Sequence, residues 1–419
     1  MVQRGPAYPP DLLDYVVSHW PGGSRLSVSP EWLGEALSSC FQASLTAEEG
    51  RPTRFRLLLT DPLSLPEDGR PNEGVLRLRF DRARPFSADE LRRLSPSAPF
   101  ETTLIGAGVD DDRLRIWGLA HSGPAWLAPT WGGRGSVPIW TSGPIIHVTG
   151  PGQLAVRCAG KLVGGLERGA LVDTTMDVFD SEWLPNLFQA QREEVREEHQ
   201  SRQLGLQSPT AVEHSLIRTV GQHMLRRAIQ LVRGARHGGM ILFVESSAMP
   251  TCLRALSLKY RFSADEPARR YRTLLLQMID RMANGTLAPS VGWSDFALDP
   301  SPALEDMERS IFELSRVIAG LAATDGAVVL DKRFEVIGFG AEVSAELPAP
   351  ERVFRAIDVE GHVRESEPVE SVGTRHRAAY RFVQDHPRGL AIVISHDGQV
   401  RFVAHQHGEV VYWEQSVSP

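Results

Sequence analysis

Two short segments in the C-terminal half combine residue types that bind phosphate groups and metal ions. The first is Gly373-Thr374-Arg375-His376-Arg377-Ala378-Ala379, which places a Gly-Thr turn and two arginines at the expected start of a helix. The first N–H groups of a helix have no partner within it and lie at the positive end of the helix dipole, so they bind phosphate oxygens. Each arginine can add a bidentate contact to phosphate. An isolated Arg-His-Arg triplet is more often a basic surface turn, but the whole segment favours a triphosphate site.

The second segment is Asp325-Gly326-Ala327, which lies between an apolar helical stretch and an apolar strand. A carboxylate at such a position can bind a divalent cation and lie beside a ribose hydroxyl group. Gly326 would let a substrate approach the backbone closely. Asp-Gly pairs are common in turns, so this segment indicates a site only in combination with the 373–379 segment.

Asp325-Gly326-Ala327, followed later in the chain by the Gly373–Ala379 segment, resembles the motif pair of the diadenylate cyclase (DAC) domain. Three other stretches resemble the same family in the same order. They are 237–244, which resembles its first core strand, Gly338-Phe339-Gly340-Ala341, which resembles the strand after the Asp-Gly-Ala hairpin, and Ile394-Ser395-His396-Asp397-Gly398, which resembles a late turn. The resemblance covers residues 210–416.

The resemblance implies an enzyme that joins two ATP molecules into cyclic di-AMP and releases two pyrophosphates. It implies that Asp325 is catalytic and that Asp325 and Asp397 bind Mg²⁺ or Mn²⁺. The implied ATP-binding residues are Gly326, Ala327, Gly340, Ala341, Thr374, Arg375, His376, Arg377 and Ser395. Many family members carry two acidic residues in the late turn, whereas this chain has His396 before Asp397.

Two other functions stay open from the sequence. The same fold could make a different cyclic or linear dinucleotide, because the residues that contact the base cannot be assigned. Alternatively, a degenerate domain could bind nucleotide and signal to a partner without catalysis. His396 is compatible with that alternative, whereas the intact Asp325 and Arg375-His376-Arg377 favour an enzyme.

Hydrophobic periodicity predicts the elements that would position these residues. Helices are expected over 216–231, over 274–282 and from Ser301 onward, and a buried strand over 240–244. Hairpins are expected at 327–330 with 335–338 and at 390–395 with 399–404, followed by a last strand at 410–413. The acidic stretch 348–371 is predicted to be a surface loop, with a lid as the less favoured alternative. The pattern predicts an α/β domain over 210–416, with a mixed sheet flanked by helices.

Residues 1–200 are predicted to form a separate α+β domain. Ser29-Pro30 is a helix start, and candidate strands lie at 54–59, 75–80, 113–119, 139–148 and 154–158. The charged stretch 189–202 is predicted to be a solvated helix that links the two domains. The region resembles uncharacterised sensor regions ahead of some DAC domains, which implies control by an unknown soluble ligand or protein.

Composition excludes several classes of protein. The chain has 419 residues and a net charge of −7, which argues against a nucleic-acid-binding surface. Its three cysteines are Cys40, Cys158 and Cys252, an odd number that fits buried thiols in a reducing cytoplasm rather than a disulfide framework. No apolar run is long enough to cross a membrane, so we expect a cytoplasmic protein.

The symmetry of the implied product predicts an oligomer. Cyclic di-AMP has two equivalent phosphodiester bonds, and each domain carries one set of motifs. Two sites that meet across a twofold axis would supply this symmetry. We therefore expect a homodimer or a higher homo-oligomer during catalysis.

Overall fold

The chain divides into two compact units, which we call unit 1 and unit 2. Unit 1 consists of residues 1–130, 135–174 and 418–419, and unit 2 of residues 131–134 and 175–417. The structure, a computed structural model, describes residues 6–21, 26–65, 75–123, 132–134, 143–167, 169–172, 176–204, 209–246, 254–263, 266–369 and 372–415. The content is mixed α/β, as predicted.

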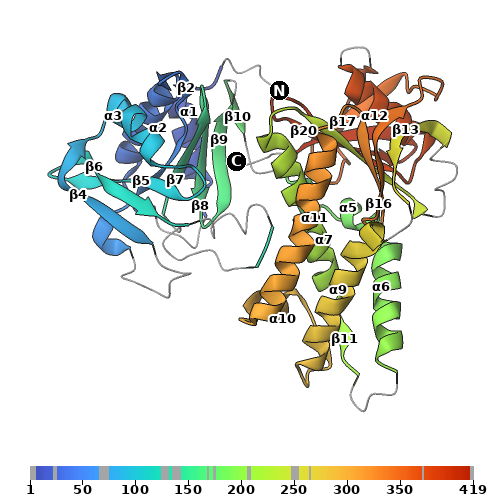
Figure 1. The fold of residues 1–419 in the computed structure, drawn as a ribbon. Coiled ribbons are helices and arrows are strands. Elements are labelled where there is room, and N and C mark those ends of the chain that lie inside the picture. The colour runs from blue at the N-terminus through green and yellow to red at the C-terminus, as the bar shows by residue number, and fades with distance from the viewer. Residues whose placement is uncertain are drawn as a thin grey trace. The chain divides into compact units, whose positions relative to one another are not determined.

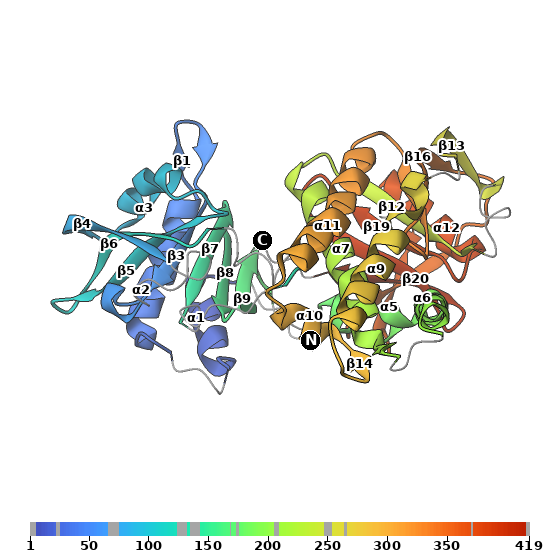
Figure 2. The same cartoon turned by 60° about the horizontal axis from the view of Figure 1, so that its bottom comes forward.

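Unit 1 is an α+β fold built on an eight-stranded sheet (Figures 1 and 2). Its strand order is β10-β9-β8-β7-β3-β5-β6-β4, and β3 pairs with β5 in parallel while the other pairs are antiparallel. The strands are β3 (Phe55–Leu59), β4 (Leu76–Pro85), β5 (Thr103–Asp110), β6 (Arg113–His121), β7 (Ile145–Gly150), β8 (Gln153–Cys158), β9 (Lys161–Glu167) and β10 (Ala170–Val172). A short hairpin, β1 (Ala47–Glu48) with β2 (Arg51–Pro52), lies outside this sheet.

Helices pack on one face of this sheet. They are α1 (Pro9–Ser18), α2 (Pro30–Ser44) and α3 (Ala88–Leu94), and α2 begins at Pro30 as predicted. Leu12 and Leu37 are fully buried against Leu57 of β3 and Ile146 of β7 in one apolar core. Cys40 and Cys158 are buried, in agreement with the prediction, and Cys252 lies outside the described residues. The predicted strand 139–148 is described only from residue 143.

Unit 2 is built on a nine-stranded mixed sheet, in agreement with the predicted fold class. Its strand order is β13-β16-β15-β12-β19-β20-β21-β17-β18. The strands are β12 (Gly239–Val244), β13 (Leu256–Arg261), β15 (Ala327–Asp331), β16 (Val336–Val343), β17 (Arg352–Ala356), β18 (Arg364–Pro368), β19 (Leu390–Ile394), β20 (Val400–Gln406) and β21 (Glu409–Gln415). The β12–β15 and β17–β21 pairs are parallel and the others are antiparallel.

Helices cover both faces of the unit 2 sheet. One side carries α5 (Trp183–Asn186), α6 (Gln189–Arg202), α7 (His214–Gly234), α9 (Glu266–Asn284), α10 (Trp293–Leu298) and α11 (Pro302–Ala322), and the other carries α12 (Thr374–Asp385) (Figures 1 and 2). In β12, Ile241 and Phe243 pack with the first set, whereas Met240 and Leu242 pack with α12. A strand covered on both faces is apolar at every position, which explains the continuous run in the sequence. A short parallel pair, β11 (Ala211–Val212) with β14 (Ser290–Val291), lies apart from the main sheet.

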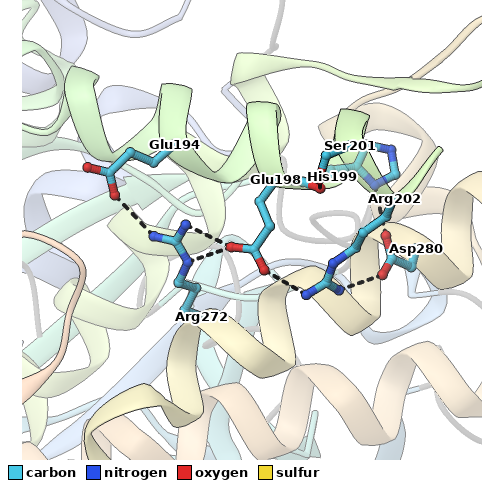
Figure 3. A network of polar contacts seen from close by, with 7 residues as sticks. All are labelled: Glu194, Glu198, His199, Ser201, Arg202, Arg272 and Asp280. Atoms are coloured by element: carbon cyan, nitrogen blue, oxygen red, sulfur yellow. Dashed lines mark hydrogen bonds and ion pairs between the residues drawn. The ribbon is translucent and has the colours of Figure 1, made fainter. Parts of the chain in front are cut away.

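The predicted linker helix has the expected bounds but is part of unit 2. In α6, Val195 and His199 are buried, which a solvated link would not require. Arg272 of α9 pairs with Glu198 at 2.8 Å and with Glu194 at 3.2 Å (Figure 3). Charged side chains on the two helices thus satisfy one another. The compact unit consequently begins at residue 175, before α6, and not near residue 200.

The prediction of a surface loop over 348–371 was wrong. Strands β17 and β18 form an antiparallel hairpin there, from Arg352 opposite Pro368 to Ala356 opposite Arg364. The hairpin joins the main sheet because Phe354 of β17 pairs with Val411 of β21. β18 lies at the edge of the sheet and has no buried residue. Its acidic residues therefore show no alternation of apolar and polar side chains from which a strand could be predicted.

Two polar contacts to Asp280 of α9 hold the C-terminal end of α6 against that helix. His199 is 1% exposed, and its Nδ1 lies 2.8 Å from Asp280 Oδ1 while its Nε2 lies 2.9 Å from the Thr210 carbonyl oxygen. Arg202 donates to the other oxygen of Asp280 at 2.8 Å (Figure 3).

None of the described helices is both long and apolar enough to span a membrane.

We expect a fragment that starts at residue 175 to be more stable than one that starts at residue 205, both ending at residue 417. The shorter fragment loses Phe188, whose ring centroid lies 5.5 Å from that of Phe334 and 5.3 Å from that of Phe243. Truncating one large buried aromatic side chain costs about 3–5 kcal/mol, so urea denaturation should give an unfolding free energy at least that much lower. Equal free energies would contradict the assignment of α6 to unit 2.

Candidate functional site

Several strand ends of unit 2 meet at one edge of its sheet. Met240 near the start of β12 lies opposite Ala327 at the start of β15, and Gly239 lies opposite Ile394 at the end of β19. Ile394 in turn lies opposite Val400, the first residue of β20. The segments 237–239, 325–327 and 395–398 therefore lie at the same edge, although the sequence separates them widely.

The Asp325-Gly326-Ala327 segment lies against β16. Ala327 pairs with Ala341, and Gly326 has a φ of +104°. A Cβ atom on Gly326 would lie 2.6 Å from the carbonyl carbon of Gly340 and 2.9 Å from the nitrogen of Ala341. Glycine is thus required here because two backbones approach closely, and this contact brings Gly340 and Ala341 to the Asp325 segment.

The Asp325 side chain is exposed, with a cation nearby that the sequence analysis missed. Lys259 of β13 lies beside this segment, since a Cβ on Gly340 would be 3.2 Å from the Lys259 Cβ and 3.6 Å from the Asp325 carbonyl oxygen. The Lys259 Nζ lies 3.0 Å from Glu342 Oε1, and this hydrogen bond, with smaller help from the charge of Asp325, raises the pKa of Lys259. The only signal in the sequence was its rarity, because the chain has three lysines.

Helix α12 begins at Thr374 with Gly373 as its N-cap, as predicted. Arg375 lies over the turn before β12, where its Nη1 is 3.5 Å from the carbonyl oxygen of His237. Gly238 has a φ of +68°, and a Cβ there would lie 2.6 Å from the same Nη1 and 2.8 Å from the carbonyl oxygen of Ile394. The first turn of α12 is therefore held at the edge where β12 begins and β19 ends.

His376 differs from its two arginine neighbours because it is partly buried. Burial, and then the charge of Arg401, lowers the pKa of His376 to about 4, with Asp397 opposing this shift. His376 is consequently neutral at neutral pH, so the positive charge of the motif resides on Arg375 and Arg377, both exposed. Arg401 of β20, which the sequence analysis did not single out, pairs with Glu414 at 2.7 Å.

Ser395 and Asp397 form the turn between β19 and β20. The Ser395 hydroxyl group donates to the Asp397 carboxylate and to the Gln399 carbonyl oxygen, and the Gln399 N–H donates back to the hydroxyl group at 3.1 Å. Arg233 of α7 donates to the Gly398 carbonyl oxygen at 3.0 Å. The geometry gives both predicted residues a role in shaping the turn, and their roles toward ATP and metal stay predictions.

The carboxylates at this edge could bind a cation whose other ligands come from water and the substrate. Among the residues that the structure describes, no three His, Cys, Asp or Glu side chains are grouped so that they could hold a metal ion. Mg²⁺ is usually bound by one or two carboxylates, while water and substrate phosphates supply the other oxygens. The exposed Asp325 can act in this way, and a closed protein cage is not needed.

The predicted residues are gathered in two connected groups. Asp325, Gly326 and Ala327 contact Gly340 and Ala341, and the first turn of α12 contacts the turns beside β12 and β19. Within the described parts of the chain, no hydrogen bond or ion pair joins Asp325 to Arg375 or Arg377. The arrangement therefore offers a carboxylate and separate cations along one sheet edge, which suits a ligand that carries both phosphates and hydroxyl groups.

Unit 1 has a polar feature of its own on the sheet face opposite its helices. Arg56 of β3 is fully buried, lies opposite His147 of β7 and donates to the Ser122 hydroxyl group at 3.3 Å. Burial lowers the pKa of Arg56 to about 9 and that of the neighbouring Arg157 to about 10. The sequence did not indicate this cluster, since Arg56, His147 and Arg157 lie on three different strands.

Comparison with known proteins identifies a likeness in unit 1. Residues 26–121 match the family described as "Probable sensor domain DACNV", which is the N-terminal sensor domain of DAC proteins. The match runs from just before α2 to the end of β6 and therefore lies within unit 1. It confirms that the N-terminal region is similar to a DAC sensor region. No curated protein matches the chain.

Replacement of His376 by glutamine is expected to flatten the pH dependence of stability. The pKa of His376 is about 4 in the folded chain and 6.5 without the fold, so between these values the unfolded chain binds more protons. Stability linked to this group is complete above pH 6.5 and is lost as the pH falls toward 4. Urea unfolding at pH 4.5 and 7.5 should show a smaller loss for the variant. The same loss in both proteins would contradict the burial of neutral His376.

Proposed function

We propose that unit 2 is a diadenylate cyclase domain that condenses two ATP molecules into cyclic di-AMP, under the control of the sensor in unit 1. The observation that carries this proposal is the convergence at one sheet edge of an exposed carboxylate, Asp325, and a helix N-terminus with two exposed arginines, Arg375 and Arg377. The match of residues 26–121 to a sensor of DAC proteins supports it independently.

The reaction follows from the charges at this edge. In each of two equivalent steps, the 3′-hydroxyl oxygen of one ATP bonds to the α-phosphorus of the other. The bond from that phosphorus to the oxygen bridging to the β-phosphorus breaks, pyrophosphate leaves and the hydroxyl proton is released. Such transfers depend mainly on positioning and on neutralising charge. In this scheme Arg375, Arg377 and the first N–H groups of α12 hold the triphosphate, and neutral His376 positions them.

Asp325 supplies the negative charge beside the hydroxyl group that attacks. Mg²⁺ or Mn²⁺ bound there would offset phosphate charge and favour loss of the hydroxyl proton. Ser395 and Asp397 would border the nucleotide through the turn between β19 and β20, with Asp397 as a second carboxylate for the cation. Gly326, Ala327, Gly340 and Ala341 would shape the nucleotide pocket, because the close approach of their backbones fixes the position of the Asp325 segment.

Two variants should separate catalysis from binding. Asp325→Asn is expected to lower the turnover of ATP at least about 100-fold, because a positioned carboxylate typically contributes 10²–10⁴-fold to proton transfer. Its dissociation constant for ATP should change little. Arg375→Ala combined with Arg377→Ala should instead raise this constant at least about 10-fold, through the loss of charged hydrogen bonds to phosphate. Calorimetry with ATP and a turnover assay make the two measurements.

A matched control is available on α11. Arg309 and Arg316 have side chains 65% and 68% exposed, and the double variant Arg309→Ala with Arg316→Ala removes the same charge elsewhere in unit 2. Unchanged ATP affinity in this control, with weakened affinity in the α12 variant, assigns the effect to the motif. Wild-type turnover by Asp325→Asn, or wild-type affinity of the α12 variant, would remove these residues from the proposed roles.

Specific activity is expected to rise with protein concentration. Each chain carries one set of motifs, so two chains must meet to form both bonds of the product. Two triphosphates repel each other, and the dimer that brings them together is therefore transient unless charge is neutralised. Activity measured across a dilution series, together with mass from light scattering, tests this. Activity independent of dilution in a sample shown to be monomeric would refute it.

A further inference from the structure

Unit 2 contains an apolar cavity that is separate from the candidate site. Its volume is about 60 Å³, and it lies among α5, α6, α7, α9 and the 332–334 turn that follows β15. Its walls include Phe188, Val195, Leu275 and Phe334, side chains of the main apolar core. A cavity of about 150 Å³ lined by similar residues holds benzene, so this one suits a short aliphatic chain better than a ring.

One buried polar atom in the wall has no hydrogen-bond partner among the residues that the structure describes. Gln191 of α6 is 7% exposed and lines the cavity. Its Oε1 is buried and makes no hydrogen bond with any residue that the structure describes. A buried polar group without a partner is costly, and the two ends of an amide can exchange places so that either a donor or an acceptor faces the cavity. A ligand with a polar group at this position would satisfy it.

Two neighbouring arginines also line the cavity. They are Arg192 of α6 and Arg218 of α7, and Arg218 is exposed, so the cavity lies next to solvent at this residue. Within the described residues neither forms an ion pair with a carboxylate, in contrast to Arg272 and Arg333, which pair with Glu194. Burial, and then the charge of Arg218, lowers the pKa of Arg192. The mouth of the cavity therefore favours an anion.

We propose that this cavity binds a short aliphatic carboxylate. The chain would enter among the apolar side chains, and the carboxylate would lie between Arg192 and Arg218 within reach of the Gln191 amide. The ligand would also contact Phe334, in the turn that leads from β15 into β16, and β15 begins beside Asp325. This site stands whether or not unit 2 is a cyclase, because none of its residues belongs to the candidate site.

The test titrates the full-length protein with acetate, propionate, butyrate, valerate and hexanoate, and with butyramide as the neutral match of butyrate. Calorimetry is expected to show a best chain length of three to five carbon atoms and binding of the best carboxylate at least about 10-fold tighter than its amide, as a charged hydrogen bond predicts. Failure of every carboxylate to bind at 10 mM would overturn the proposal, as would equal binding of butyrate and butyramide.

A pair of glycine variants locates the binding. Gly221 of α7 lines the cavity, and a Cβ there would lie 3.3 Å from the Tyr271 hydroxyl oxygen and 3.4 Å from Phe334 Cε2. Gly221→Ala thus fills part of the space while it favours the helix, and should weaken binding at least about 10-fold. Gly320→Ala adds the same methyl group to α11 with nothing within 4 Å and should bind as the wild type does.

A charge variant tests the carboxylate contact without filling the cavity. Arg218→Ala removes an exposed side chain and should weaken butyrate binding about 5–10-fold while butyramide binding and the unfolding temperature stay unchanged. Wild-type butyrate affinity in either Gly221→Ala or Arg218→Ala would place the binding elsewhere and contradict the assignment.

Discussion

The pairing of β12 with β15 on one side and β19 on the other is the constraint on which unit 2 depends. Met240 lies opposite Ala327 in the parallel pair, and Gly239 lies opposite Ile394 in the antiparallel pair. A slip of one residue would turn every side chain of a strand to the other face and would disrupt its close packing against the helices on both faces. Burial on both faces therefore fixes the register, and the register places the 237–239, 325–327 and 395–398 segments at one edge.

Small residues complete this arrangement where backbones come together. Gly326 admits β16 and Gly238 admits the guanidinium group of Arg375, and both adopt positive φ angles. The site edge is thus built by close packing of main chains, with charged side chains placed on its exposed rim. Charges at such an exposed rim are partly screened by water and salt.

Much of the fold could be predicted because its signals are local. The bounds of α6, the start of α12 after Gly373 and the hairpin of β19 with β20 follow from periodicity, caps and turns. The β17–β18 hairpin and the packing of α6 in unit 2 could not be predicted, since both depend on partners distant in sequence. The sequence likewise named the residues of the candidate site, but not Arg401 beside His376 or the buried amide of Gln191, which only tertiary packing brings into place.

The central claim is that the edge formed by β12, β15 and β19 makes cyclic di-AMP. The most direct measurement incubates the full-length protein with ATP and Mg²⁺ or Mn²⁺ and identifies the products by mass. The account predicts cyclic di-AMP with two pyrophosphates for each molecule formed. A linear or different dinucleotide would mean that the same fold catalyses another reaction. ATP that binds and stays intact would contradict the account and favour a signalling domain without catalysis.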